Sequence, residues 1–276
     1  MERVLIVGAG YVGRELGQRL RKKSPGSQIT GWVSSAASAL HLKELGWEVI
    51  AGNVVDPALW RKQSWDVVYY CAAASQGGLE AYETVYKQGL SLALKESWKQ
   101  FIYTSSTSVY GQYEGEWVDE TSLTQPTEPT ALCLLEAEQR VQQAGGTVAR
   151  LSGIYGPGRG YLFRKLMQGE ALLDGTEERW INQIHRDDIV NALLFLAEKE
   201  ETRGQVWNAT DDEPVRVIDF YKWACQTFNR PMPPHAPSSV KPQRKNANKR
   251  ISNRKLRAAG WNLIYPTFRE GYLGDL

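Results

Sequence analysis

Hydrophobic residues gather in short runs that alternate with amphipathic stretches along the first half of the chain. Runs rich in β-branched and aromatic residues are typical of buried strands, and they fall at 3–7, 28–33, 47–50, 67–70, 101–104 and 147–151. Helical periodicity marks the intervening residues 11–23, 36–45, 79–97 and 130–144. Such alternation predicts an α/β fold with a doubly wound parallel sheet, whose ligand lies beyond the carboxyl ends of the strands.

The pattern changes after about Ser152, where Gly/Pro-rich loops surround short helices near 187–198 and 217–228. Residues 231–242 hold five of the 12 prolines and predict an extended loop. We expect residues 1–276 to form a single Rossmann domain with a small C-terminal α/β substrate lobe. That lobe is expected to consist mainly of residues 155–180 and 210–276.

A glycine motif with the spacing G-x-G-x-x-G follows the first predicted strand and opens the first predicted helix, which is the context that a dinucleotide site requires. Gly8 allows the tight turn, Gly10 lets the backbone approach a pyrophosphate, and Gly13 lets the helix pack closely on the strand. We expect the phosphates to face N–H groups of this turn, with Tyr11 and Val12 at the positive end of the helix.

Composition narrows the class of protein. The net charge is +2, and no apolar run approaches the roughly 18 residues of a membrane span. The N-terminus has no signal-peptide pattern, so we expect a cytoplasmic protein without a membrane partner. Cys71, Cys133 and Cys225 are odd in number and far apart, which fits neither a disulfide framework nor a metal site.

The choice of dinucleotide rests on the segment after the second predicted strand. NAD-binding proteins usually place a carboxylate there to accept the ribose 2′-hydroxyl, whereas this chain has Ser34 and Ser35. Without a carboxylate to repel a 2′-phosphate, NADP(H) is favoured over NAD(H). The alternative is that the two serines only cap the next helix.

Several segments together resemble the extended short-chain dehydrogenase/reductase superfamily of the NAD-dependent epimerase/dehydratase type. These segments are residues 103–111, 150–159, 184–188, 207–210 and 249–261. The resemblance implies that Asn53 and Val54 contact the adenine. It also implies that the small side chains following the fourth strand, Ala72, Ala73 and Ala74, pass close to the ribose and nicotinamide, although close helix–sheet packing would explain them equally well.

The chain departs from this family at the positions of the catalytic residues. The resemblance places the substrate-orienting hydroxyl on Ser106, but aligning the helix on Glu138 puts Thr130 and Leu134 at the positions of the catalytic Tyr and Lys. Threonine does not ionise usefully near neutral pH, whereas a tyrosine can be tuned by a neighbouring cation. We therefore expect an atypical member that lacks the Tyr-Lys pair. A further Y-x-x-x-K match at residues 161–165 is interpreted as coincidence.

Other side chains are candidates for the missing acid and for substrate binding. Tyr155 and His185 each follow a strand in a family-like segment, and histidine suits proton transfer at neutral pH, although a structural role stays open for both. We expect substrate contacts from residues near these segments, namely Thr107, Ser108, Tyr110, Arg159 and Arg186. Both guanidinium groups suit an anionic substrate, and surface placement is their alternative.

Two functions stay open. The first is an NAD(P)-dependent oxidoreductase or isomerase that acts on a small polar substrate, such as a nucleotide-sugar, through a non-standard acid or base. The second is a non-catalytic NADP(H)-binding redox sensor or assembly protein. Residues 241–257 carry eight Lys or Arg and no acid, but no nucleic-acid module is present, so no nucleic-acid partner is expected. We expect a monomer or a homodimer.

Overall fold

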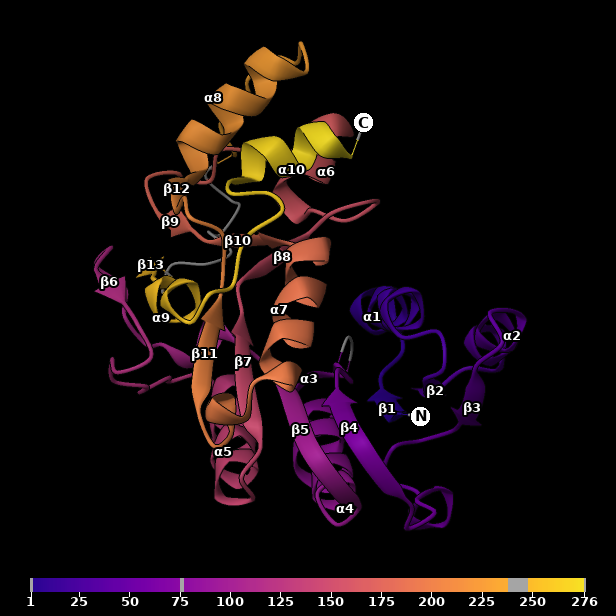
Figure 1. Cartoon of the computed structure of the whole chain (residues 1–276). Coiled ribbons are helices and arrows are strands. Elements are labelled where there is room, and N and C mark those ends of the chain that lie inside the picture. Colours follow the sequence, from indigo (N-terminus) through magenta and orange to yellow (C-terminus); the bar gives the residue numbers. More distant parts are fainter. Residues whose placement is uncertain (1, 75–76, 238–247, 276) are drawn as a thin grey trace. The chain divides into compact units, whose positions relative to one another are not determined.

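A seven-stranded sheet forms the centre of the computed structural model, which describes residues 2–74, 77–237 and 248–275 (Figure 1). The strands are ordered β11-β7-β5-β4-β1-β2-β3, so the order reverses between β1 and β4. Their bounds are β1 (Arg3–Val7), β2 (Gln28–Val33), β3 (Glu48–Ala51), β4 (Ser64–Tyr70), β5 (Ser97–Ser106), β7 (Thr147–Leu151) and β11 (Val206–Ala209). The predicted doubly wound, parallel Rossmann sheet is confirmed.

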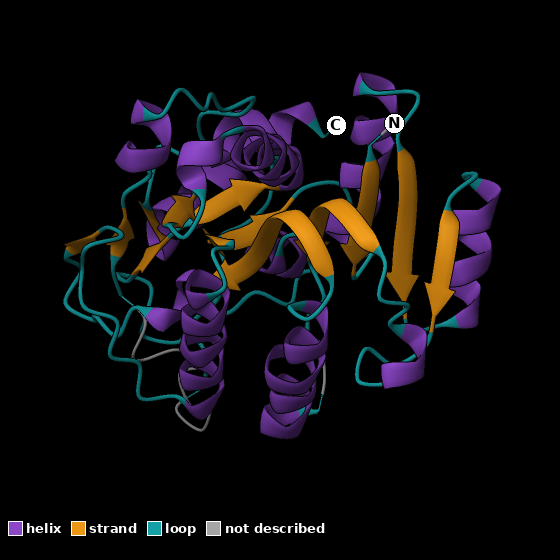
Figure 2. Ribbon diagram, turned by 60° about the horizontal axis from the view of Figure 1, so that its bottom comes forward, coloured by secondary structure: helices purple, strands orange, loops and turns teal. Residues whose placement is uncertain are grey.

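Helices flank the sheet, which lies between helical layers in Figure 2. Helix α1 (Tyr11–Lys23) packs on β1 and β2, and α2 (Ala36–Glu44) packs on β2 and β3. Helix α5 (Pro129–Gln143) packs on β5, and helix α7 spans Arg186–Glu198. No helix in the described ranges combines the length and apolar character needed to span a membrane.

One predicted helix differs from the structure. The helix expected over residues 79–97 consists of α3 (Gly78–Tyr82), a π-helical segment η2 (Glu83–Gly89) and α4 (Leu90–Ala93). It ends early because Ser97 already pairs with Ser64 of β4, in register with the rest of β5. Strand β5 is therefore longer than the predicted 101–104, and its polar first residues hide that extension in the sequence.

The chain divides into two compact units. The first comprises residues 1–109, 126–150 and 189–207, and the second comprises 110–125, 151–188 and 208–276. Three two-stranded sheets lie in the second unit: β8 (Gly153–Tyr155) with β10 (Gln183–His185), β9 (Trp180–Ile181) with β12 (Val215–Arg216), and β6 (Trp117–Val118) with β13 (Arg250–Ile251). Its helices are α6 (Tyr161–Met167), α8 (Val217–Thr227), α9 (Arg254–Ala258) and α10 (Phe268–Gly274).

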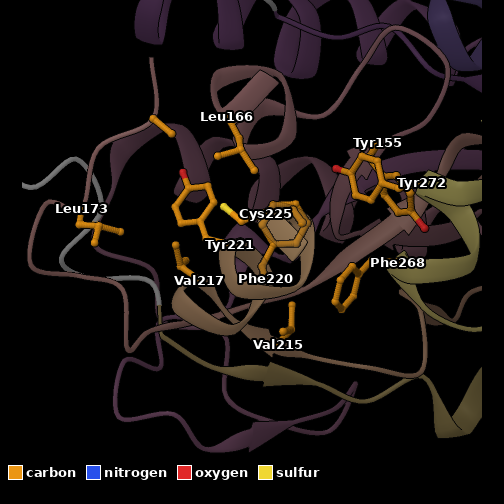
Figure 3. Packing of buried hydrophobic residues seen from close by; sticks show 12 residues of the cluster. Tyr155, Leu166, Leu173, Val215, Val217, Phe220, Tyr221, Cys225, Phe268 and Tyr272 are labelled. Atoms are coloured by element: carbon orange, nitrogen blue, oxygen red, sulfur yellow. The ribbon is translucent and has the colours of Figure 1, made fainter. Parts of the chain in front are cut away.

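Aromatic side chains build the core of the second unit (Figure 3). Phe220 of α8 and Phe268 of α10 are fully buried, and Tyr272 stacks on Tyr155 with ring centroids 4.5 Å apart. Within the predicted extended loop of residues 231–242, His235 forms an isolated β-bridge with Leu173, and residues 238–242 lie outside the described residues. This core fixes β8, α6 and α10 against one another.

Candidate functional site

The glycine turn after β1 has the conformation that its sequence predicts. Gly8 adopts φ +88°, and a Cβ on it would lie 2.4 Å from the backbone nitrogen of Ala72. A Cβ on Gly13 would lie 2.5 Å from the Gly8 carbonyl oxygen. A Cβ on Gly10, in contrast, would meet no protein atom within 4 Å. Two of the glycines are thus required by the packing of the turn, and the third borders open space.

The N–H groups of the turn itself are bonded within the protein, which differs from the expectation that they face the phosphates. Gly8 and Ala9 both donate to the Trp32 carbonyl oxygen, and Gly10 donates to that of Gly8. The first helical N–H to bond back is that of Arg14, to the Gly10 carbonyl. The N–H groups of Val12 and Gly13 precede it at the positive end of α1, so the helix start is the part of the loop suited to an anion.

Ser34 and Ser35 follow β2, and both are exposed. The Ser35 hydroxyl caps α2 by accepting from the Ser38 backbone nitrogen at 3.2 Å, and it also donates to the Ser38 hydroxyl. The capping alternative therefore describes Ser35 in this structure. Neither residue introduces a negative charge at the end of β2, so the argument for NADP(H) rests on Ser34 and on that absence of a carboxylate.

The remaining predicted cofactor residues also lie at the carboxyl ends of strands. Asn53 is exposed after β3, where its side-chain oxygen accepts from the Val55 backbone nitrogen, while Val54 is buried. Ala72, Ala73 and Ala74 follow β4, and Gly8 lies directly against the first of them. Because the ends of β1, β2, β3 and β4 share one edge of the sheet, the fold gathers all these residues along that edge.

Ser106 ends β5 and leads into the short helix η3 (Thr107–Val109). Its hydroxyl oxygen accepts from the Ser108 backbone nitrogen at 3.2 Å, which leaves the hydroxyl proton available for a substrate oxygen. Helix α5 packs against η3, with Thr130 half-buried and Leu134 only 4% exposed. An apolar side chain thus fills the position that the family resemblance assigns to a lysine.

Tyr155 and His185 lie together in the second unit, at paired positions of β8 and β10, with ring centroids 5.2 Å apart. Both are 1% exposed. Burial raises the pKa of Tyr155, whose hydroxyl points at the Thr267 carbonyl. Burial lowers the pKa of His185, although its bond to Asp275 opposes that shift. The His185 Nδ1 accepts from the Asp187 backbone nitrogen, so both ring nitrogens are engaged. Their roles as acids stay predictions.

The predicted substrate residues fall in different surroundings. Tyr110 is 1% exposed, and its hydroxyl donates to the Asn208 side chain at 2.9 Å. Arg186 pairs with the adjacent Asp187 carboxylate through both Nε and Nη2, each at 3.0 Å. Arg159, in contrast, lies in a turn that lines a cavity of the second unit.

That cavity has a volume of about 420 Å³ and lies wholly within the second unit. Its walls come from β8, α6, β9, β10, the start of α8 and the loop between α6 and β9. The lining includes four cationic side chains: Arg159, Arg164, Lys165 and Arg179. We predicted only the first of these as a substrate residue. The Lys165 ammonium lies 5.0 Å from the Tyr161 ring centroid, so the supposedly coincidental Y-x-x-x-K match forms a contact on α6.

Two carboxylates of the same lining accept hydrogen bonds from residues of their own turn. The Asp174 carboxylate accepts from the Thr176 hydroxyl at 2.6 Å, and that of Glu177 accepts from the Gly175 backbone nitrogen at 2.8 Å. With Glu170 as the third acid, the lining carries one more positive than negative charge. The lining of this concave site thus combines cationic and acidic groups, with a small positive excess.

Comparison with known proteins gives consistent matches. The family model described as "NAD dependent epimerase/dehydratase family" matches residues 4–210. Protein YeeZ of Escherichia coli (strain K12) is 30% identical over 236 residues, covering 80% of this chain and 82% of that protein. A functionally unknown conserved protein from Silicibacter pomeroyi DSS superposes with a TM-score of 0.80 at 28% identity, covering 100% and 98% of the two chains. UDP-glucuronic acid 4-epimerase from Bacillus cereus, solved with UDP-glucuronic acid and NAD, has a TM-score of 0.81 at 18% identity, covering 99% and 97%; it shares the fold.

Proposed function

Because the chain belongs to the NAD dependent epimerase/dehydratase family, we propose that it is an NADP(H)-preferring oxidoreductase or isomerase of a small anionic substrate, with nucleotide-sugars as the leading class. The cationic cavity of the second unit carries this proposal. A protein that only sensed a dinucleotide at the glycine turn would need no second concave site, and the lining of this one carries four cations against three acids. Two ligand sites are what a reaction between cofactor and substrate requires.

The residues of the first unit suit the cofactor. The start of α1 and the open space beside Gly10 would hold the pyrophosphate, and Ser34 would face the 2′-phosphate. A bound nicotinamide supplies hydride transfer. Ser106 presents a hydroxyl whose oxygen is already oriented by the Ser108 N–H, so its proton can be donated to a substrate oxygen. The proton that a Tyr-Lys pair would exchange must come from another group, and Tyr155 and His185 stay the candidates.

A fluorescence titration tests the cofactor part of the proposal. The ten tryptophans report binding of NADPH, NADP, NADH and NAD to the purified chain. In Gly10→Ala the new methyl group enters the open space, so we expect binding to weaken at least tenfold with little loss of fold stability. Gly26→Ala is the matched control, because its Cβ also meets no protein atom within 4 Å but lies far from the turn in sequence. Equal affinities in the two variants would contradict the assignment of the turn.

The preference between cofactors has its own test. In Ser34→Asp, the new carboxylate would repel a 2′-phosphate and accept a 2′-hydroxyl, so the ratio of NADPH to NADH affinity should fall by at least tenfold. Ser38→Asp serves as the control, since it places the same charge one helical turn further along α2. If Ser34→Asp leaves this affinity ratio unchanged, Ser34 does not distinguish the 2′-phosphate from the 2′-hydroxyl of the ribose.

A measurement of turnover distinguishes the proposed enzyme from a non-catalytic sensor. With a substrate found by screening nucleotide-sugars for a change in nicotinamide absorbance, Ser106→Ala should lower kcat, while Arg164→Met should mainly raise KM. The buried Leu134 favours the alternative of a non-catalytic sensor, which would bind oxidised and reduced dinucleotides unequally and convert no substrate.

We also propose that the protein acts in the cytoplasm as a monomer or homodimer, as the sequence led us to expect.

A further inference from the structure

Tyr221 of α8 lines the cavity of the second unit with a side chain that is 3% exposed. Its ring belongs to the buried face of α8, because Val217, Ala224 and Cys225 recur at helical spacing on the same face. In Figure 3 the Tyr221 hydroxyl points away from Val217 and Phe220, two other members of the buried cluster. The ring is therefore part of the core, whereas the hydroxyl lies at the edge of the core.

The Tyr221 hydroxyl makes no hydrogen bond to another of the described residues. The hydroxyl of a buried tyrosine usually has a hydrogen-bond partner. The Tyr221 oxygen is also not one of the unpartnered polar atoms that lack accessible surface, so it borders the space of the cavity. A phenylalanine, as at the adjacent Phe220, would fill the apolar core equally well. Packing alone therefore does not account for the hydroxyl.

The ionisable groups near this hydroxyl belong to the cavity. Burial raises the pKa of Tyr221 to about 12, and the next strongest influences on this pKa come from Tyr161, Arg179 and Asp174. All three of these side chains line the cavity. Because the pKa lies far above neutrality, the hydroxyl keeps its proton and can donate it in a hydrogen bond. A neutral donor near a guanidinium group suits an anionic oxygen, which can accept from both.

From this arrangement we infer that Tyr221 is a specificity-determining residue of the cavity, whose hydroxyl donates to an anionic oxygen of the ligand that Arg179 also binds. The inference rests on the proposed function of the cavity as the substrate site. A phosphoryl or carboxylate oxygen accepts from both donors, and hydrogen bonds to charged groups are stronger than those between neutral groups. The hydroxyl therefore favours ligands that carry an anionic group at this wall over uncharged ligands of similar size.

The variant Tyr221→Phe tests the inference, because it removes the hydroxyl and keeps the ring. Calorimetric titration of the full chain uses inorganic pyrophosphate and glucuronate as probes, so that a phosphoryl group is distinguished from a carboxylate. We expect Tyr221→Phe to weaken binding of the probe that the wild type binds by about tenfold. Thermal melts of the ligand-free protein should show no loss of Tm in this variant, because the hydroxyl has no partner among the described residues.

Tyr272→Phe is the matched control. Tyr272 belongs to the same buried cluster, but its hydroxyl bonds to the Gln183 side chain and it lies outside the cavity lining. Its affinity for either probe should equal that of the wild type. A loss in Tyr221→Phe that is confined to pyrophosphate identifies a phosphoryl group at this wall, and a loss confined to glucuronate identifies a carboxylate; either result supports the inference.

The remaining outcomes overturn the inference and separate it from the proposed function. If the wild type binds neither probe, the anionic substrate site fails, and the role of Tyr221 fails with it. If Gly10→Ala weakens binding while Arg164→Met does not, the probe binds at the glycine turn, and both proposals fail again. If Arg164→Met weakens binding but Tyr221→Phe does not, or if Tyr272→Phe weakens it equally, the cavity stands as an anion site and the role of Tyr221 is refuted.

Discussion

The ion pair between Arg150 and Glu138 should be one of the strongest links between α5 and the central sheet. The Arg150 Nε lies 3.1 Å from both carboxylate oxygens, and Nη2 lies 2.7 Å from Oε2. The two residues are 4% and 1% exposed. The Ser105 hydroxyl donates to the same carboxylate at 2.6 Å, immediately before Ser106. The ion pair therefore fixes α5 beside the end of β5, where Ser106 carries the hydroxyl that we propose orients the substrate.

Removing one partner should leave the other charge buried and unpaired. Arg150→Met or Glu138→Gln should each lower the free energy of unfolding by about 3–5 kcal/mol. For a chain of this size, each kcal/mol corresponds to about 2–4 °C in Tm, so the expected loss is roughly 10 °C. The double variant buries no charge, and its loss should be smaller than the sum of the single losses by at least about 2 kcal/mol.

Urea unfolding followed by circular dichroism measures the free energy of unfolding of the wild type, the two single variants and the double variant. Lys23→Met provides the comparison, because Lys23 and its partner Glu198 are 55% and 54% exposed and an exposed pair contributes at most about 1 kcal/mol. Single-variant losses below about 1 kcal/mol, or a double-variant loss equal to the sum, would show that this buried pair is not what holds α5. The reasoning that places Glu138 in a structural role would then be wrong.

Three further predictions concern other positions. Gly8→Ala combines φ +88° with a Cβ 2.4 Å from the Ala72 backbone nitrogen, so thermal melts should show a loss of several kcal/mol, whereas Gly26→Ala should change stability by less than about 0.5 kcal/mol. Because burial lowers the pKa of His185, its stabilising effect is present above about pH 6.5 and is lost as the pH falls; urea unfolding at pH 7.5 and pH 5 should show a smaller decrease for His185→Asn than for the wild type. Burial lowers the pKa of Lys249 to about 8, so wild type should gain up to about 3 kcal/mol relative to Lys249→Met between pH 7 and pH 10.5; a difference that stays constant with pH would refute this.

The sequence was sufficient to predict the elements whose signals are local. Strands β1, β2 and β7 and helix α1 have the predicted bounds, because runs rich in hydrophobic residues in the strands and an amphipathic pattern in the helix are bounded by residues that favour turns. Strand β11 was not identified as part of the sheet, since Val206–Ala209 is short and carries a buried Asn208 that periodicity does not reveal. Its segment was recognised only through the family resemblance.

The cavity could not be predicted in the same way. Its walls depend on pairing between strands of two or three residues, such as β8 with β10, which are too short to show periodicity. Arg164 and Lys165 look like ordinary surface residues of a helix, and Arg179 lies in a loop, until the pairing brings them to one concavity.

The predicted departure from the family's catalytic pair falls on a buried face of α5 in the structure. Leu134 is 4% exposed on the face of α5 that also carries the buried Ala131 and Glu138. A lysine there would have to bury an ammonium group in a helix face whose buried acid already pairs with Arg150. The leucine is thus integrated into the packing of the first unit, and a single substitution would not restore the family's usual site. If the protein is an enzyme, we expect its proton transfer to use groups other than the residues at positions 130 and 134.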